Sequence, residues 1–308
     1  MEMNIAELKE LLPTLANTPP NRNIEELQAQ TTFKETIKKE FVEFESSRKI
    51  SSIVSVMNKS QTINGVLITG EGGVGKSTIV TSILKKEGVD FVYLNSYSTA
   101  LKLFINCYNN RTKTIVLDDI ESILQDKKGV SILKSLLWGN GNRLVTYETT
   151  TKMDIPTRYI FEGKIIILSN ATLDDDIVMN SLKSRLICRE ISISFKEKVK
   201  LAGDIIKSNY PKLEDGDVEQ IVAFIEEHTN KATKNLNFRT FIKVAEYYTS
   251  IPYSWRELAK EEFEVDSDKE LVLRLMNGQK SVIDQVREFE ALTGKGRRTY
   301  FRVKKWIK

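Results

Sequence analysis

The sequence predicts an α/β fold in which a five-stranded parallel sheet is followed by helical segments. From residue 65 onward, short apolar runs alternate with helical stretches, which is typical of a parallel sheet with helices on its faces. The strand pattern stops after Phe195, and Lys196 to Tyr248 shows helical periodicity. Two further helices are predicted over 281–292 and 297–307, so a helical region follows the sheet.

The predicted strands are Val66–Thr69, Phe91–Leu94, Thr114–Leu117, Lys164–Leu168 and Glu190–Ser194. A helix over Lys76–Glu87 follows the first strand, and Gly88 ends it. The 308 residues suffice for two or three domains. We expect an N-terminal helical segment over 1–48, a sheet-containing core over 49–195, a helical region over 196–250 and a C-terminal region over 251–308.

The composition predicts a soluble, cytoplasmic protein with no membrane partner. Hydrophobic residues make up 41% and charged residues 29% of the chain, as in ordinary globular proteins. Apolar runs such as Lys164–Leu168 are too short to span a bilayer, and the first residues are acidic where a signal peptide needs basic ones. Cys107 and Cys188 are far apart, and the single histidine, His228, disfavours a histidine metal site.

The segment from Gly65 to Thr78 carries a phosphate-binding pattern, G-x-x-x-x-G-K-[ST], between a strand and a helix. Its glycines let consecutive N–H groups form an anion nest, and the following helix directs its positive end at the same phosphates. Lys76 is expected to reach the β- and γ-phosphates, and the Ser77 hydroxyl to ligate Mg²⁺. The predicted cofactors are therefore ATP and Mg²⁺, bound by Gly70, Glu71, Gly72, Gly73, Val74, Gly75, Lys76, Ser77 and Thr78.

A second motif, Thr114 to Asp119, places two acids at the carboxyl end of a strand, where open α/β sheets bind ligands. Asp118 is expected to help hold Mg²⁺, as in a Walker B motif. With the phosphate-binding loop, this motif makes residues 50–250 resemble the AAA+ family of P-loop ATPases. The resemblance implies a five-stranded parallel core, a helical lid over 196–250 and ATP hydrolysis.

The resemblance also assigns roles to polar residues outside these two motifs. Asp119 stands where the family usually has the glutamate that polarises the attacking water, so hydrolysis is expected to be slow or to use Glu121 instead. Asn170 corresponds to sensor 1 and Asn95 to a polar switch residue. Arg239, at the start of a lid helix, corresponds to sensor 2.

Arg185, in the segment from Asn180 to Arg185, resembles the family's arginine finger, with Arg189 as the other candidate. Such a finger enters the site of a neighbouring subunit and stabilises transition-state charge. The resemblance therefore implies head-to-tail self-assembly into a closed ring or an open spiral.

An insertion between the third and fourth strands, from Trp138 to Tyr159, is expected to contain a hairpin. Its strands would be Leu144–Glu148 and Thr157–Phe161, with Lys152 near the tip. Two interpretations remain open: contact with DNA or a partner, as in several AAA+ clades, or a packing elaboration.

The segment from Gly294 to Lys308 contains seven basic residues and no acidic one. In the preceding helix, apolar residues at 282, 283, 286 and 289 should form the packing face. In the last helix, Tyr300, Val303 and Ile307 fall opposite the basic residues at 100° per residue. This arrangement resembles a helix-turn-helix that binds duplex DNA, with contacts from Arg297, Arg298, Arg302 and Lys305. A basic solvated tail and a protein-docking helix are the alternatives.

These features together predict an oligomeric, Mg²⁺-dependent AAA+ ATPase that acts on DNA. The layout resembles replication initiators, helicase loaders and phage or transposition ATPases, which favours a phage or mobile-element replication role and a replicative helicase or other replication protein as partner. The alternative is a slow-hydrolysing, ATP-gated DNA-binding switch or transcription regulator, which Asp119 favours. A protein remodeller would need a pore loop, and Tyr97–Phe104 is too ambiguous to be one.

Overall fold

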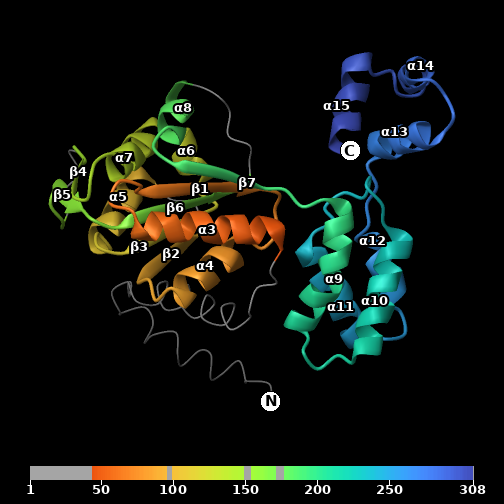
Figure 1. Cartoon of the computed structure of the whole chain (residues 1–308), viewed down its shortest axis with the longest axis horizontal. Coiled ribbons are helices and arrows are strands. Elements are labelled where there is room, and N and C mark those ends of the chain that lie inside the picture. Colours follow the sequence, from red (N-terminus) through yellow and green to blue (C-terminus); the bar gives the residue numbers. More distant parts are fainter. Residues whose placement is uncertain (1–43, 96–98, 149–153, 171–176, 308) are drawn as a thin grey trace, which may run out of the picture. The chain divides into compact units, whose positions relative to one another are not determined.

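The structure is a computed structural model that describes residues 44–95, 99–148, 154–170 and 177–307 (Figure 1). Most of the predicted N-terminal segment 1–48 lies outside the described residues, as do Lys152 and residues 97–98 of the ambiguous segment Tyr97–Phe104. The domain bounds proposed from the sequence stay predictions.

Five strands form one parallel sheet in the order β2-β3-β6-β1-β7. They are β1 (Gly65–Gly70), β2 (Phe91–Asn95), β3 (Thr114–Asp118), β6 (Lys164–Ser169) and β7 (Ile187–Ile191). The predicted class, a five-stranded parallel sheet followed by helical regions, is confirmed.

The predicted bounds of the last strand, Glu190–Ser194, are wrong. Strand β7 ends at Ile191 because its pairing with β1 starts at Val66 opposite Ile187 and ends at Gly70 opposite Ile191. Ser194 instead caps the next helix, its side chain accepting a hydrogen bond from the backbone of Glu197.

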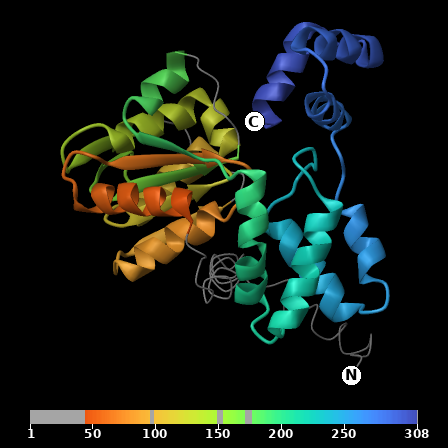
Figure 2. The same ribbon diagram turned by 45° about the vertical axis from the view of Figure 1, so that its right-hand side comes forward.

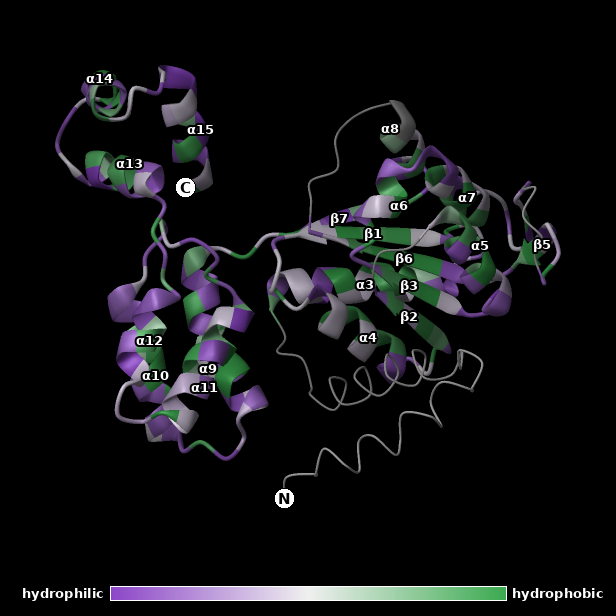
Figure 3. Ribbon diagram, turned by 180° about the vertical axis from the view of Figure 1, so that it is seen from behind, coloured by the Kyte–Doolittle hydropathy of each residue, from purple (hydrophilic) through white to green (hydrophobic). Residues whose placement is uncertain are grey.

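Alternate residues of the buried strands face two helical layers. Leu67 belongs to one hydrophobic cluster and its neighbours Val66 and Ile68 to the other. Figure 3 shows the strands as largely hydrophobic, whereas the helices carry both kinds of residue. The helices packed on the Val66 side are α3 (Glu45–Lys59) and α4 (Lys76–Lys86); those on the Leu67 side include α5 (Ala100–Asn109), α6 (Glu121–Gln125), α7 (Lys127–Leu137) and α8 (Ile177–Lys183).

The insertion before β6 contains the expected hairpin. Strands β4 (Arg143–Thr146) and β5 (Arg158–Phe161) pair antiparallel, with Leu144 opposite Ile160. Val145 and Phe161 are buried, whereas Leu144 and Ile160 are exposed. The hairpin thus has one packed and one solvent-facing side, which leaves both of its predicted roles open.

Two helical groups follow β7 (Figure 2). The first comprises α9 (Phe195–Asn209), α10 (Asp215–His228), α11 (Phe238–Ser250) and α12 (Trp255–Glu261), in which α9 contacts both α10 and α11. The second comprises α13 (Ser267–Asn277), α14 (Val282–Thr293) and α15 (Arg297–Ile307), packed around a hydrophobic cluster of its own. Within the described part of the chain, no helix has the length and apolar character needed to cross a membrane.

The predicted packing face of α14 is only half correct. Val286 and Phe289 are buried, but Val282 and Ile283 are 46% and 65% exposed. Ser281 caps α14 by accepting a hydrogen bond from the backbone of Asp284, so 282 and 283 lie in the first turn. That turn extends past the small cluster formed with α13 and α15.

We expect Gly163→Ala to destabilise the protein. Gly163 lies between β5 and β6, and a Cβ there would stand 1.9 Å from the carbonyl oxygen of Lys113. The backbone cannot easily retreat, because Gly163 donates a 2.9 Å hydrogen bond to Arg111. Overpacking of this kind costs about 1–3 kcal/mol, measurable by urea unfolding.

Gly216→Ala is the matched control. Gly216 lies in α10 with no atom within 4 Å of an added Cβ, so alanine should stabilise by up to about 1 kcal/mol. Equal stability of the two variants would contradict the crowding argument.

Candidate functional site

The phosphate-binding loop joins the end of β1 to the start of α4. Gly73 and Gly75 have φ values of 79° and 81°, a left-handed conformation that glycine adopts without strain. At Gly73 an added Cβ would also lie 2.5 Å from the Asn237 side-chain oxygen. Position 73 therefore requires glycine both for its conformation and for the close approach of Asn237. The loop leads into a helix N-terminus suited to an anion.

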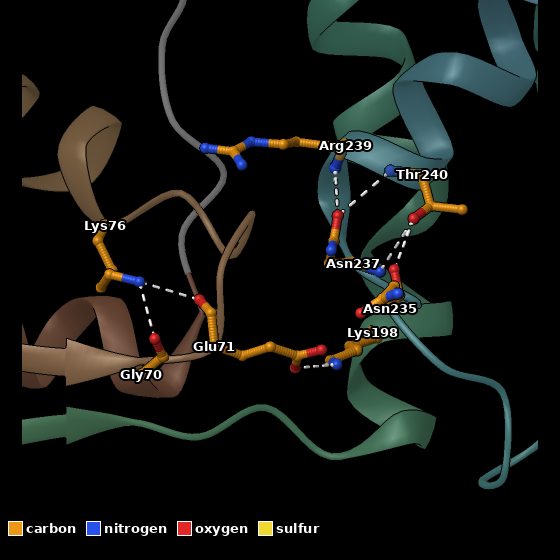
Figure 4. A network of polar contacts seen from close by, with 8 residues as sticks. All are labelled: Gly70, Glu71, Lys76, Lys198, Asn235, Asn237, Arg239 and Thr240. Atoms are coloured by element: carbon orange, nitrogen blue, oxygen red, sulfur yellow. Dashed lines mark hydrogen bonds and ion pairs between the residues drawn. The ribbon is translucent and has the colours of Figure 1, made fainter. Parts of the chain in front are cut away.

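Lys76 is the first residue of α4 and is only 7% exposed. Its ammonium donates hydrogen bonds of 2.9 Å to the carbonyls of Gly70 and Glu71 (Figure 4). It also donates a hydrogen bond of 2.7 Å to Oδ1 of Asn170. Burial lowers the pKa of Lys76, whereas the charges of Asp118 and Asp119 raise it. The structure thus holds a buried cation where the loop meets the helix.

Asn170 connects Lys76 to the acidic motif. Its side-chain nitrogen donates a 2.9 Å hydrogen bond to Oδ1 of Asp119 while its oxygen accepts from Lys76. Asp119 has φ 52°, an uncommon conformation for a residue with a side chain. Residues that follow three different strands, β1, β3 and β6, therefore meet in one hydrogen-bonded network at the carboxyl edge of the sheet.

Asp118 ends β3 and is 9% exposed. One carboxylate oxygen accepts a 3.1 Å hydrogen bond from the backbone of Asp119, and the other accepts from the hydroxyl of Tyr93. Tyr93 also forms a side-chain hydrogen bond with Ser77. Burial raises the pKa of Asp118, and the hydrogen bond from Tyr93 lowers it.

A magnesium ion fits the donor chemistry of Ser77 and Asp118. A hydroxyl and a carboxylate are hard oxygen ligands, and Mg²⁺ commonly takes few protein ligands beside substrate phosphates. Tyr93 contacts both residues, which brings these oxygens to one place. Among the described residues there is no group of three or more His, Cys, Asp or Glu side chains that could hold a metal.

Glu121, the other candidate for polarising water, has a different partner. It begins α6, and its Oε1 accepts a 3.2 Å hydrogen bond from the buried Ser169. Of the two predicted acids, Asp119 is the one that the structure joins to Asn170 and Lys76. Asn95 lies on the adjacent strand in register with Asp118.

Helices α9 and α11, which lie at the two ends of the predicted lid (196–250, called the lid from here on), contact the loop between β1 and α4 directly. Lys198 of α9 forms an ion pair with Glu71, and the backbone of Phe238 donates a 3.1 Å hydrogen bond to the carbonyl of Gly73. Asn237 caps α11 by accepting from the backbone of Arg239 at 2.9 Å. Figure 4 shows the Arg239 side chain extending from this cap toward the loop, and its charge lowers the pKa of Lys76.

Arg185 lies just before β7, at the opposite edge of the sheet from the loop. Strand β7 starts at Ile187 and only its end, Ile191, pairs with Gly70. The Arg185 guanidinium lies 5.0 Å from the ring centre of Trp138 and donates to the carbonyl of Ser181, while its buried Nε has no hydrogen-bond partner. Both residues line a pocket of about 500 Å³. Arg189 is exposed and donates to the carbonyl of Cys188.

The basic helix α15 has the predicted two-sided character. Tyr300, Val303 and Ile307 are buried, and Tyr300 donates a 2.6 Å hydrogen bond to Gln285 of α14. Gly294 has φ 69° and ends α14, so α15 follows after a short turn. The predicted DNA contacts are all exposed: Arg297, Arg298, Arg302 and Lys305.

The remaining basic residues that the structure describes in this segment are engaged within the chain. Lys295 pairs with Asp268 at 2.5 Å, and the Lys304 ammonium lies 5.4 Å from the Tyr300 ring centre. Trp306 is 74% exposed and Phe301 is 39% exposed, and both belong to α15 with the exposed basic residues.

Three residues of the candidate site were missed by sequence analysis: Tyr93, Trp138 as the partner of Arg185, and Lys198. Each acts through a contact with a residue far away in sequence. Their local sequence carries no signal for these contacts, because a tyrosine in a strand or a lysine in an amphipathic helix is ordinary.

No protein-family model matches the sequence, and no curated protein does. Among solved structures, the Thermotoga maritima RuvB Holliday junction branch migration motor is 15% identical, covering 86% of this chain and 90% of that chain, with a TM-score of 0.49. Domain III of the Thermotoga maritima replication initiation protein DnaA is 13% identical over 72% of this chain and 94% of that chain, with a TM-score of 0.46. AMPPCP-bound DnaA from Aquifex aeolicus is 15% identical over 77% and 72%, with a TM-score of 0.45. The likeness concerns the fold alone.

The ion pair between loop and lid predicts an asymmetric response to mutation. The Lys198 side chain is 10% exposed and that of Glu71 46% exposed. Glu71→Ala leaves a buried charge unpaired, and the partial access of water reduces the usual cost to about 1–3 kcal/mol. Lys198→Met removes the buried charge at similar volume and should change the stability by less than about 1 kcal/mol.

Urea unfolding of both variants beside the wild type measures this difference. The opposite ranking, with Lys198→Met the less stable variant, would contradict the burial argument.

Proposed function

We propose that this protein is an oligomeric, Mg²⁺-dependent ATPase of the AAA+ type that acts on DNA. The observation that carries the proposal is the network of Lys76, Asn170 and Asp119 at the phosphate-binding loop. Arrangement of a cation, an amide and a carboxylate at a glycine-rich loop suits the binding and hydrolysis of a nucleoside triphosphate.

The roles of the residues follow from their positions. The N-terminus of α4 and Lys76 would bind the β- and γ-phosphates, while Ser77 and Asp118 would hold Mg²⁺, which neutralises phosphate charge when bound. Asn170 and Asp119 would orient the attacking water, because they are hydrogen-bonded to each other beside Lys76. Arg239 would sense the γ-phosphate from the lid.

Arg185 is proposed to act on the site of a neighbouring copy. Within one chain it lies before β7, whereas the loop lies where that strand ends, so the two are at opposite edges of the sheet. A head-to-tail contact would bring one edge against the other and would generate a ring or a spiral. The exposed ring of Trp138, against which Arg185 packs, would lie in the same contact.

DNA is the proposed substrate, bound by α15. Its exposed face carries Arg298, Arg302 and Lys305, and its buried face packs against α14. Phosphate contacts would give most of the affinity, and an arginine in the major groove would add contacts to guanine. The biological setting we propose is phage or mobile-element replication, as an initiator or helicase loader that meets a replicative helicase or another replication protein.

A slow, ATP-gated DNA-binding switch is the second candidate. Asp119 has one methylene fewer than glutamate, and its carboxylate is tied to Asn170. That restraint favours slow turnover. Tight ATP binding with negligible hydrolysis, with or without DNA, would support the switch over the motor or loader.

Mixing two inactive variants should test the shared site. Lys76→Ala removes the phosphate-binding cation, and Arg185→Ala removes the arginine finger. We expect each variant alone to have an ATPase rate lower by about 10³-fold or more. An equimolar mixture should recover part of the rate, since some interfaces combine an intact loop with an intact Arg185. Steady-state phosphate release measures this, with Arg189→Ala as the control that retains the rate.

The wild-type rate should also rise with protein concentration. A dilute, demonstrably monomeric sample that hydrolyses ATP as fast as a concentrated one would refute the role of Arg185 in a neighbouring site.

Replacing Arg298 and Arg302 by alanine should weaken DNA binding and leave ATP binding intact. Loss of two phosphate contacts should reduce the salt slope of duplex binding by about 2. Fluorescence anisotropy with labelled duplex at several salt concentrations measures the slope. The control is Lys196→Ala with Lys200→Ala, an exposed basic pair of the same spacing on α9. Unchanged affinity would move the DNA-binding surface elsewhere, for example to the β4–β5 hairpin.

A further inference from the structure

Tyr93 lies between the two residues proposed to hold magnesium. It belongs to the edge strand β2, in register with Val116 of β3. Its hydroxyl donates to Oδ2 of Asp118, and a second side-chain hydrogen bond joins it to Ser77. A neutral hydroxyl thus contacts both groups that a metal at this site would use.

Both oxygens of the Asp118 carboxylate already have donors. Oδ1 accepts from the backbone of Asp119 at 3.1 Å, and Oδ2 accepts from Tyr93. The backbone donor is fixed by the chain, whereas the hydroxyl belongs to a side chain that can rotate away. A metal or a metal-bound water that approaches Asp118 from the side of Ser77 therefore competes with Tyr93.

Tyr93 acts here as a hydrogen-bond donor to Asp118 and not as a phenolate ligand of the metal. Burial raises the pKa of Tyr93 above its usual range, and the hydrogen bond to Asp118 raises it further. Near neutral pH the group is a neutral hydrogen-bond donor, as an ordinary tyrosine is. Donation to a carboxylate is stronger than donation to a neutral acceptor, so giving it up has a measurable cost.

We propose that Tyr93 is a positioning residue that sets the magnesium affinity of the site, because its hydroxyl bridges Ser77 and Asp118 and must be displaced when the metal binds. This inference rests on the proposed function, since it presupposes nucleotide and metal at this loop. The consequence is a higher magnesium requirement than Ser77 and Asp118 alone would give. Metal-free Asp118 would remain satisfied by a donor rather than stand buried and unpaired.

Tyr93→Phe should lower the half-saturating magnesium concentration for nucleotide binding by about 3- to 10-fold, the equivalent of one net hydrogen bond. Binding of a fluorescent ATP analogue to the full chain, titrated with MgCl₂, measures it. Without metal, in EDTA, the variant should bind the analogue as the wild type does. Tyr248→Phe is the matched control, because Tyr248 donates a 2.6 Å hydrogen bond to Asp217 within the lid.

An unchanged or raised half-saturating concentration in Tyr93→Phe would overturn the inference. Should that variant fail to fold, the tyrosine difference spectrum of the wild type decides. Loss of a carboxylate acceptor on addition of Mg²⁺ and nucleotide shifts the tyrosine band to shorter wavelength, and absence of the shift would overturn the inference. Failure of the wild type to bind nucleotide at any magnesium concentration would instead refute the proposed function.

Discussion

The buried ammonium of Lys76 is the constraint on which the rest of the candidate site depends. A cation at 7% exposure is costly unless acceptors replace the water it loses. Two carbonyls of the loop and the amide oxygen of Asn170 do so, and Asp118 and Asp119 supply compensating charge. These groups come from the carboxyl ends of β1, β3 and β6, which the backbone pairing of the sheet places side by side.

Much of the fold follows from local sequence. The first four strands of the parallel sheet and the helix that begins at Lys76 are specified by apolar runs and by glycines, which act within a few residues. The edge strand β7 is different, since Arg189 and Glu190 interrupt its apolar pattern and pairing with β1 decides its bounds. Val282 and Ile283 show the same limit: periodicity places them on one face with Val286, but the cluster around α14 is too small to cover the first turn.

The residues of the candidate site also fall into two groups, those marked by local sequence and those placed by contacts between distant segments. The loop, Asp118 and Asn170 are recognisable because strand ends and glycines mark them in the sequence. Contacts between distant segments leave no such mark. The hydroxyl of Tyr93 reaches Asp118 on the neighbouring strand. Lys198 reaches Glu71 across more than a hundred residues of sequence (Figure 4). Only the assembled sheet and lid bring these partners together, and they are the contacts that would tune the site.

The contacts between the lid and the loop converge on one short segment. The carbonyl of Gly73 accepts a hydrogen bond from the backbone of Phe238. The Asn237 side chain occupies the space where a Cβ at Gly73 would lie. Asn237 in turn caps the helix that carries Arg239. A phosphate in the loop would interact with the amides around Gly73 and with Arg239. Gly73 contacts Asn237 and Phe238, which directly precede Arg239, so one ligand would contact both sides of this junction. The cap of α11 is thus in direct contact with the loop between β1 and α4.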